Sequence, residues 1–384
     1  MTLSLPTGFS CYVANIGIKD DTDDLVVVAS DRPASASGLF TRSRFAGPSV
    51  AVSREAVADG RARAVVVISK NANVATGHDG LCDAREVVDG VAKALGAQSD
   101  DVLIASTGVI GRRYPMDRVR AGLARVPASL PGSDADAVAR GIMTTDTVPK
   151  TAAASAGAAR VVGVAKGVGM IEPDMATLIT LAFTDAEVDP PTLDTIWRRV
   201  IDRTFNCVSV DTDTSTSDTA IVLANGAAGP VDLDELERAL HEVALSLTKQ
   251  VARDGEGAET LIEVRVSGAR DDFQAKRVAK AIVNSPLVKT AVHGADPNWG
   301  RVAMAIGKCS DDTDIDQDRV TIRFGDTEVY PRRLDDADLV VLSDYMHGDD
   351  VLIDVDLAIA RGAATVWGCD LTDGYVRINA DYTT

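Results

Sequence analysis

The residues with the clearest chemical potential lie between Lys166 and Thr184, where a loop sequence changes into a strand sequence at Thr177. The loop part contains glycines, which permit unusual backbone dihedrals, and Pro173, which holds the residue before it in an extended conformation. Residues 177–183 are β-branched or apolar and contain no breaker, so they predict a buried strand. The pattern therefore predicts a hydroxyl at the first residue of a buried strand.

Such a hydroxyl is suited to self-cleavage of the chain. The Oγ of Thr177 can attack the preceding carbonyl, and hydrolysis of the resulting ester would break the bond between Ala176 and Thr177. The new α-amine of Thr177 would then lie beside the hydroxyl of the same residue and act as its base. Most threonines that begin a strand serve β-propensity or a local hydrogen bond, so this hypothesis depends on the motifs that accompany the segment.

Seven separated motifs occur with this segment in one order along the chain. They are Asn71-Ala-Asn73 with Thr76-Gly77, Ser106-Thr-Gly-Val-Ile-Gly111, Thr144-Thr-Asp-Thr147 with Pro149-Lys150, Asp213-Thr-Ser-Thr216 with Asp218-Thr219, Asp254-Gly-Glu-Gly257, Asp296-Pro-Asn-Trp-Gly-Arg301, and the segment from Tyr375 to Thr384. Together they resemble the ornithine acetyltransferase (glutamate N-acetyltransferase) family over nearly the whole chain.

This resemblance implies the fold and the organisation of the chain. The expected fold class is α/β, with the N-terminal-nucleophile-like layered core of the family and a smaller C-terminal α/β lobe. Autocleavage would divide the chain into residues 1–176 and residues 177–384, and the smaller lobe would cover roughly residues 270–384. We expect both fragments to share one core and to remain associated as a heterodimer, with a higher oligomer such as α2β2 or α4β4.

The resemblance also implies a ping-pong reaction. Thr177 is the expected nucleophile, which takes the acetyl group of N-acetylornithine, releases ornithine and passes the acetyl group to glutamate. Thr107 and Gly108 match the oxyanion-hole pair of the family. By their pattern alone they form a glycine-containing turn at the end of a strand, which is either an ordinary turn or a source of backbone amides for an oxyanion.

The family's substrate-binding residues map onto Thr144, Lys166, Thr177, Glu256, Asn379 and Thr384. The threonine motif leaves Thr145 as an alternative to Thr144. Lys166 can receive a substrate carboxylate, although a lone lysine is more often solvated. Glu256 follows an amphipathic helix between two glycines and can receive an amino-acid ammonium, although it can equally be an exposed helix-end carboxylate.

Some positions depart from the family pattern or point to one branch of it. Lys70, Thr212 and Ser217 stand where family members commonly carry a small residue, glycine and asparagine, respectively. Three motifs are more similar to the ornithine acetyltransferase of clavulanic-acid-type antibiotic clusters than to the general enzyme of arginine biosynthesis: Asn73-Val-Ala-Thr76, Asp211-Thr-Asp-Thr214 and Cys309-Ser-Asp-Asp-Thr313. This similarity favours N-acetylornithine as the acetyl donor.

Composition excludes several classes of protein. A formal net charge of −18 argues against nucleic-acid and anionic-membrane partners, and it would favour a cationic amino acid as ligand. The five cysteines are scattered and form no CxxC pair, which disfavours a disulfide framework and a structural zinc site and favours a reducing, cytoplasmic location. The acidic run Asp211–Thr219 lacks EF-hand spacing, so no metal is expected. No glycine loop indicates a nucleotide, and no cofactor is expected.

Three alternatives to the acetyl-transfer reading remain open. The enzyme can be bifunctional and also use acetyl-CoA to acetylate glutamate. It can be an N-terminal-nucleophile aminopeptidase or amidase, in which water resolves the acyl-threonine. Outside enzymes, it can be a catalytically silent amino-acid-binding protein in which Thr177 is merely a strand residue.

Periodicity predicts the elements that must position these residues. Strands are expected at residues 25–29, 49–53, 64–69, 101–105, 177–183, 260–266 and 302–306, with a hairpin within 315–330 and further strand from 351. Helices are expected at residues 83–95, 116–126, 134–143, 191–206, 232–253 and 272–291.

Overall fold

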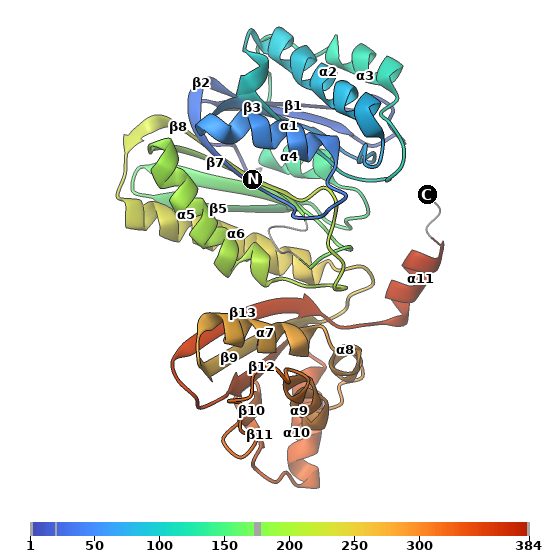
Figure 1. The fold of residues 1–384 in the computed structure, drawn as a ribbon, viewed down its shortest axis with the longest axis vertical. Coiled ribbons are helices and arrows are strands. Elements are labelled where there is room, and N and C mark those ends of the chain that lie inside the picture. The colour runs from blue at the N-terminus through green and yellow to red at the C-terminus, as the bar shows by residue number, and fades with distance from the viewer. Residues whose placement is uncertain (1–2, 20, 173–177, 382–384) are drawn as a thin grey trace.

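The computed structural model describes residues 3–19, 21–172 and 178–381, and its strands form two sheets (Figure 1). The larger sheet has eight strands in the order β4-β3-β2-β8-β7-β6-β5, with β1 paired to β2. These strands are β1 (Phe9–Ala14), β2 (Leu25–Phe40), β3 (Arg61–Ile68), β4 (Val102–Ser106), β5 (Lys150–Ala156), β6 (Ala159–Lys166), β7 (Ile179–Glu187) and β8 (Thr219–Pro230).

Strand β2 joins the two halves of this sheet. Its first part, from Leu25 to Ala29, pairs with β1 and β3, and its last part, from Ser35 to Phe40, pairs with β8. The register shifts between Ala29 and Ala34. A strand with such an irregularity bends, so the two halves can pack face to face.

The apolar side chains show four layers. Val28 of β2, Val65 of β3 and Phe183 of β7 belong to one buried cluster between the two halves of the sheet. Val27 of β2 faces the opposite way, into a cluster with α2, and Val222 of β8 faces α5 and α6 in a third. The helices are α1 (Pro48–Ala56), α2 (Gly77–Leu95), α3 (Met116–Leu123), α4 (Ala135–Ile142), α5 (Pro190–Arg203) and α6 (Leu233–Arg253). Helices therefore cover both outer faces of two packed β layers.

Strands from before and after position 177 hydrogen-bond to one another within the larger sheet. Strand β6 pairs with β7 along its length, and β2 pairs with β8. The chain before position 177 supplies β1 to β6, and the chain after it supplies β7 and β8. The eight-stranded sheet is therefore built from both parts of the chain, whereas the second sheet lies wholly after position 177.

The C-terminal lobe contains the second sheet, in the order β11-β10-β12-β9-β13. It lies below the layered core in Figure 1, and its sheet begins at Leu261. Its elements are β9 (Leu261–Ala269), α7 (Asp272–Val283), α8 (Pro286–His293), α9 (Trp299–Gly307), β10 (Thr321–Phe324), β11 (Thr327–Tyr330), α10 (Asp336–Met346), β12 (Asp350–Asp356) and β13 (Gly362–Cys369), followed by α11 (Asp373–Asp381). One apolar cluster runs continuously from α5 and α6 into this lobe.

Two predicted strands are helices. Residues 49–53 lie in α1, where Pro48 stands in the first turn and the buried residues Ser49, Val50, Val52 and Ser53 follow a helical period. Residues 302–306 lie in α9. Both segments are short apolar runs, and a short run does not distinguish a strand from a buried helix. Packing against neighbouring elements decided the outcome.

The single helix predicted over residues 272–291 is also wrong, because the chain forms α7 and α8 there. Ser285 caps α8 by accepting a hydrogen bond from Val288 N, and Pro286 occupies its first turn. Proline has no N–H to donate and fits the first turn of a helix better than its interior. Pro286 therefore begins a new helix.

The longest helices were predicted well. The side chain of Asp232 caps α6 by accepting hydrogen bonds from Asp234 N and Glu235 N. Helix α2 begins earlier than predicted, at Gly77, and ends before Gly96, which has the left-handed φ of 62°.

Among the helices of the described residues, none has both the length and the apolar composition needed to cross a membrane.

Candidate active site

A cavity of about 320 Å³, lined by both polar and apolar side chains, lies where β6 ends and where β7 and β8 begin. Six residues assigned from the sequence line it: Thr107, Gly108, Thr144, Lys166, Glu256 and Asn379. Ala176, Thr177 and Thr384 lie outside the described residues. The chain on either side of the 173–177 gap lines the cavity through Met170 and Leu178. The assigned residues come from distant parts of the chain, and the fold brings these six together.

Gly108 occupies a position that excludes a side chain. Its φ is 126°, and an added Cβ would lie 2.2 Å from the carbonyl carbon of Lys70. The backbone N–H of Thr107 donates to the carbonyl of Ile68 at 3.1 Å, so it is already engaged. The hydroxyl of Thr107 accepts a hydrogen bond from Lys166 Nζ at 3.3 Å. The side chain of Thr107, rather than its amide, is therefore the group suited to an anion in the cavity.

A buried network of charges lies behind the cavity. Lys150 Nζ is 2.8 Å from Asp146 Oδ1 and 2.5 Å from Asp254 Oδ2, and the side chains of Lys150 and Asp146 are both 0% exposed. Asp146 also accepts hydrogen bonds from the backbone N–H groups of Thr144 and Gly167, at 3.0 and 2.7 Å. The network thus connects the segments that carry Thr144, Lys166 and Glu256. Asp146 and Lys150 belong to a motif whose pattern predicts no role for either residue, because their partner Asp254 comes from a distant segment.

The network sets the charge of Lys166. Burial lowers the pKa of Lys166, and the carboxylate of Asp146, 4.0 Å away, raises it in part. For Asp146, burial raises the pKa, but the charges of Lys166 and Lys150 outweigh that effect and lower it below its usual value. Asp146 is therefore held as a carboxylate, and the charge of Lys166 depends on its acidic neighbours.

Glu256 projects into the cavity from the loop that follows α6. Its carboxylate accepts hydrogen bonds from Thr145 Oγ1 at 3.2 Å and from Asn379 Nδ2 at 2.9 Å. Its backbone N–H donates to the carbonyl of Val168 at 2.7 Å. A Cβ at Gly169 would lie 2.5 Å from the carboxylate, so only glycine fits there without displacing Glu256. Both Thr144 and Thr145 line the cavity, and Thr145 contacts Glu256.

The loop from Asp211 to Ser217 forms another wall of the cavity. Asp211 accepts hydrogen bonds from the backbone N–H groups of Met170 and Ile171, at 2.7 and 2.8 Å. Thr212 has a left-handed φ of 68°, a conformation that glycine adopts without strain. Glu172 N also donates to the carbonyl of Asp213 at 3.0 Å, so the loop holds residues 170–172 in place.

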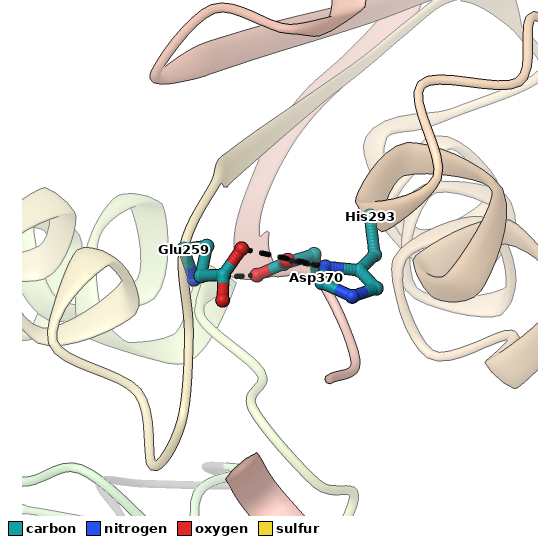
Figure 2. Close-up of side chains that lie close together, drawn as sticks. All are labelled: Glu259, His293 and Asp370. Atoms are coloured by element: carbon teal, nitrogen blue, oxygen red, sulfur yellow. Dashed lines mark hydrogen bonds and ion pairs between the residues drawn. The ribbon is translucent and has the colours of Figure 1, made fainter. Parts of the chain in front are cut away.

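Glu259, His293 and Asp370 form a separate cluster outside the cavity lining (Figure 2). His293 Nδ1 lies 3.1 Å from Asp370 Oδ2 and 3.7 Å from Glu259 Oε2. Asp370 Oδ1 accepts the backbone N–H groups of Glu259 and Thr260, at 2.9 and 3.0 Å. Asp370 thus has partners for both oxygens, and these contacts account for the cluster as a brace between β13, α8 and the loop before β9.

Two packed β layers between helices, with a cavity at the strand ends, define an N-terminal-nucleophile type of α/β protein. The chain belongs to the ArgJ family, whose model matches residues 10–384. The family resemblance and the fold class predicted from the sequence are therefore confirmed.

Two of the relatives match this chain over nearly its whole length. The chain is 61% identical to a Streptomyces clavuligerus protein named glutamate N-acetyltransferase Oat2, over 100% of this chain and 99% of that protein. It is 56% identical to a Nostoc protein named arginine biosynthesis bifunctional protein ArgJ 2, over 99% and 98% of the two chains. A solved structure of the Bacillus halodurans protein ArgJ is 40% identical, with a TM-score of 0.49 over 52% of this chain and 96% of that chain.

Proposed function

We propose that this chain cleaves itself between Ala176 and Thr177 and then transfers an acetyl group from N-acetylornithine to glutamate. The observation that carries the proposal is the convergence of Thr107, Gly108, Lys166 and other assigned residues on one cavity beside the start of β7. The name of the Streptomyces clavuligerus relative supports the same reaction class.

In the first half-reaction, Thr177 Oγ attacks the acetyl carbonyl carbon of N-acetylornithine while the α-amine of Thr177 takes the hydroxyl proton. The carbonyl oxygen becomes an anion, which the hydroxyl of Thr107 and the backbone amide of Gly108 stabilise. The bond between carbon and nitrogen then breaks, and the ammonium of Thr177 returns the proton to the leaving nitrogen. Ornithine leaves, and the acetyl group remains on Thr177 as an ester.

In the second half-reaction, the amino group of glutamate attacks the ester carbonyl. The α-amine of Thr177 accepts the proton that the attacking nitrogen loses, and the same oxyanion contacts form. The ester bond breaks, Thr177 Oγ regains a proton, and N-acetylglutamate leaves. The ester intermediate divides one difficult transfer of the acetyl group, from one nitrogen to another, into two easier steps. Both steps balance in atoms and protons without a cofactor.

Lys166 and Glu256 recognise different charged groups of the substrates. Lys166 offers a cation to a carboxylate, which both N-acetylornithine and glutamate carry. Glu256 offers a carboxylate to the side-chain ammonium, which N-acetylornithine carries and glutamate lacks. Charged hydrogen bonds of this kind are stronger than neutral ones, so the Glu256 contact distinguishes donor from acceptor.

Glu256→Gln is therefore expected to raise KM for N-acetylornithine about tenfold, because a hydrogen bond to a charged partner contributes about 1.5 kcal/mol or more. KM for glutamate should change less than threefold. Steady-state kinetics with each substrate varied in turn measures both values. Glu259→Gln is the matched control, since Glu259 lies three positions along the chain and outside the cavity lining, and its KM values should match the parent. Equal effects of Glu256→Gln on both substrates would contradict this role.

The test of the reaction is a time course of ornithine release from N-acetylornithine by the cleaved protein. With glutamate, release should continue and match the formation of N-acetylglutamate. Without glutamate, release should stop after about one equivalent, because the acetyl ester has no acceptor. Continued release without glutamate would instead identify an amidase, and the absence of any release would favour a binding protein. Replacing N-acetylornithine by acetyl-CoA in the same assay tests the bifunctional alternative.

The two fragments are expected to stay together after cleavage. The pairs β6 with β7 and β2 with β8 each join a strand from before position 177 to one from after it. Size-exclusion chromatography with light scattering would measure the mass of the native assembly and so distinguish αβ, α2β2 and α4β4 forms.

A further inference from the structure

A second cleft of the layered core concentrates positive charge. It has a volume of about 820 Å³ and is lined by residues of β2, α1, β3 and α5 and of the turns beside them. It shares no lining residue with the candidate active site. Its charged residues, which define the arginine cleft, are Arg42, Arg54, Arg61, Arg198, Asp59 and Asp194. Four arginines beside two aspartates contrast with the formal net charge of −18 of the whole chain.

The two carboxylates of the arginine cleft are already engaged. One oxygen of Asp194 accepts a hydrogen bond from Arg198 Nε at 2.7 Å, and the other accepts one from Ser37 Oγ at 2.7 Å. Asp194 and Arg198 therefore balance each other. Asp59 accepts the backbone N–H of Arg61 at 2.9 Å, so it contacts the main chain of that arginine rather than its guanidinium.

The guanidinium of Arg54 is held by uncharged groups. Its Nη2 donates to the carbonyl of Thr41 at 3.2 Å, and its central carbon lies 5.8 Å from the centre of the Phe40 ring. These contacts orient the cation without cancelling its charge. Among the described residues, neither Arg54 nor Arg61 forms an ion pair with a carboxylate. Two guanidinium groups of the cleft therefore lack a counter-charge from that part of the chain.

Two glycines fix the shape of the arginine cleft. An added Cβ at Gly38 would lie 2.7 Å from Cζ of Phe40, and one at Gly60 would lie 2.5 Å from Cβ of Pro190. The backbone thus approaches Phe40 and Pro190 more closely than any other residue type allows. The cleft is formed before a ligand binds, and a preformed site loses less conformational freedom on binding.

We propose that the arginine cleft binds a small anion that carries two linked phosphate groups. A guanidinium presents paired N–H donors that match phosphate oxygens, and it remains charged at every physiological pH. Two guanidinium groups without a counter-charge suit a ligand with adjacent negative charges. The volume lies within the range of small-molecule sites and is sufficient for inorganic pyrophosphate or for the diphosphate of a nucleotide.

Arg54 connects the arginine cleft to the candidate active site. Thr41, whose carbonyl accepts from Arg54, donates its hydroxyl to the carbonyl of Ser215 at 2.7 Å and its N–H to that of Asp218 at 3.0 Å. Ser215 and Asp218 line the candidate active site. A charge-assisted hydrogen bond is stronger than one to a carbonyl, so a bound phosphate draws Arg54 away from Thr41 and loosens this wall. The anion is therefore an effector rather than a substrate. This consequence rests on the proposed function, whereas binding itself does not.

Isothermal titration calorimetry with inorganic pyrophosphate as the probe tests the site, at low ionic strength and without divalent cations. The parent should bind one pyrophosphate per chain and should bind orthophosphate about tenfold more weakly, because orthophosphate engages fewer charged donors. Replacing Arg54 and Arg61 together by glutamine should weaken pyrophosphate binding by about tenfold or more for the same reason. The control replaces Arg120 and Arg332, which form ion pairs outside the cleft, and removes the same charge. Its affinity should remain close to that of the parent.

A further variant is expected to strengthen binding, which a misfolded protein could not do. Asp59→Asn removes one negative charge from the cleft and keeps an oxygen for the backbone N–H of Arg61. Its affinity for pyrophosphate should exceed that of the parent at low ionic strength, and the gain should shrink as salt is added. ADP in place of pyrophosphate distinguishes the sources of the phosphates. Equal affinity would show that the phosphates alone are recognised, and tighter binding would show that a nucleotide is the ligand.

Kinetics of the cleaved protein test the connection through Thr41. Saturating pyrophosphate should raise KM for N-acetylornithine about fivefold in the parent, a modest coupling between two sites. The variant without Arg54 and Arg61 should show the same KM with and without pyrophosphate. An unchanged KM in the parent, with pyrophosphate bound, would refute the connection.

Two binding results would overturn the site itself. Absence of saturable pyrophosphate binding by the parent would show that the arginines are only solvated. Parent affinity in the variant without Arg54 and Arg61 would place the anion elsewhere, for instance at Lys166. A parent that binds pyrophosphate but transfers no acetyl group would instead refute the proposed function, so the two failures are distinguishable.

Discussion

Replacing Thr177 by alanine is expected to give one uncut chain of 384 residues with no acetyl transfer. Alanine removes the Oγ that attacks the preceding carbonyl, and without cleavage no α-amine forms to act as a base. The loss of kcat should exceed about 10⁴-fold, as for other enzymes that lose a covalent nucleophile. Thr177→Ser keeps the hydroxyl and should cleave slowly and retain partial activity.

Denaturing intact-mass spectrometry of the freshly purified variants measures cleavage directly. The parent should give fragments of residues 1–176 and 177–384, and the alanine variant should give one mass. Thr180→Ala is the matched control, because Thr180 lies three positions further along the chain, in β7, with its hydroxyl donating to the carbonyl of Val164. This variant should cleave as the parent does. Two fragments from Thr177→Ala would show that another group cleaves the chain.

Replacing Lys150 by methionine is expected to lower the free energy of unfolding by about 3 kcal/mol, because the change leaves buried carboxylates without their cation. Lys150 is the direct partner of both Asp146 and Asp254, and methionine has similar length but no charge. Catalysis should fall as well, since Asp146 holds the backbone of Thr144 and Gly167 beside the cavity.

Chemical denaturation followed by circular dichroism measures this loss, in the uncut Thr177→Ala background so that two fragments do not separate on unfolding. Arg198→Met is the control, because Arg198 pairs with Asp194 at the surface and such a pair contributes about 0–1 kcal/mol. Adding Asp254→Asn to Lys150→Met should restore part of the stability by removing one buried charge. A loss below about 1 kcal/mol for Lys150→Met would mean that Lys166 or water replaces the missing cation.

Strong periodicity made part of the fold predictable. Helix α6 shows an apolar face from Leu236 to Val251 and begins at a capping aspartate, and these local signals agree with its burial. Residues 49–53 and 302–306 gave the wrong answer because short apolar runs carry no period that separates strand from helix. Packing of α1 against β4, and of α9 within the C-terminal lobe, decided those segments.

The residues of the candidate site also differ in how far the sequence could predict them. The family resemblance predicted Thr107, Gly108, Lys166 and Glu256 as site residues, and these four line one cavity. No local pattern could show that Lys150 would be enclosed between Asp146 and Asp254, because Asp254 comes from a distant segment of the chain.

The sequence by itself determined the family, the expected nucleophile and the polar residues available to the substrates, since these depend on residue type and order. Only the tertiary structure decided which of them meet. It joined Thr145, Glu256 and Asn379 by hydrogen bonds and enclosed Lys150 between Asp146 and Asp254. Burial and charge set a pKa, and both arise largely from neighbours far away in the chain, so the charge states of Lys166 and Asp146 emerge only when the chain is folded.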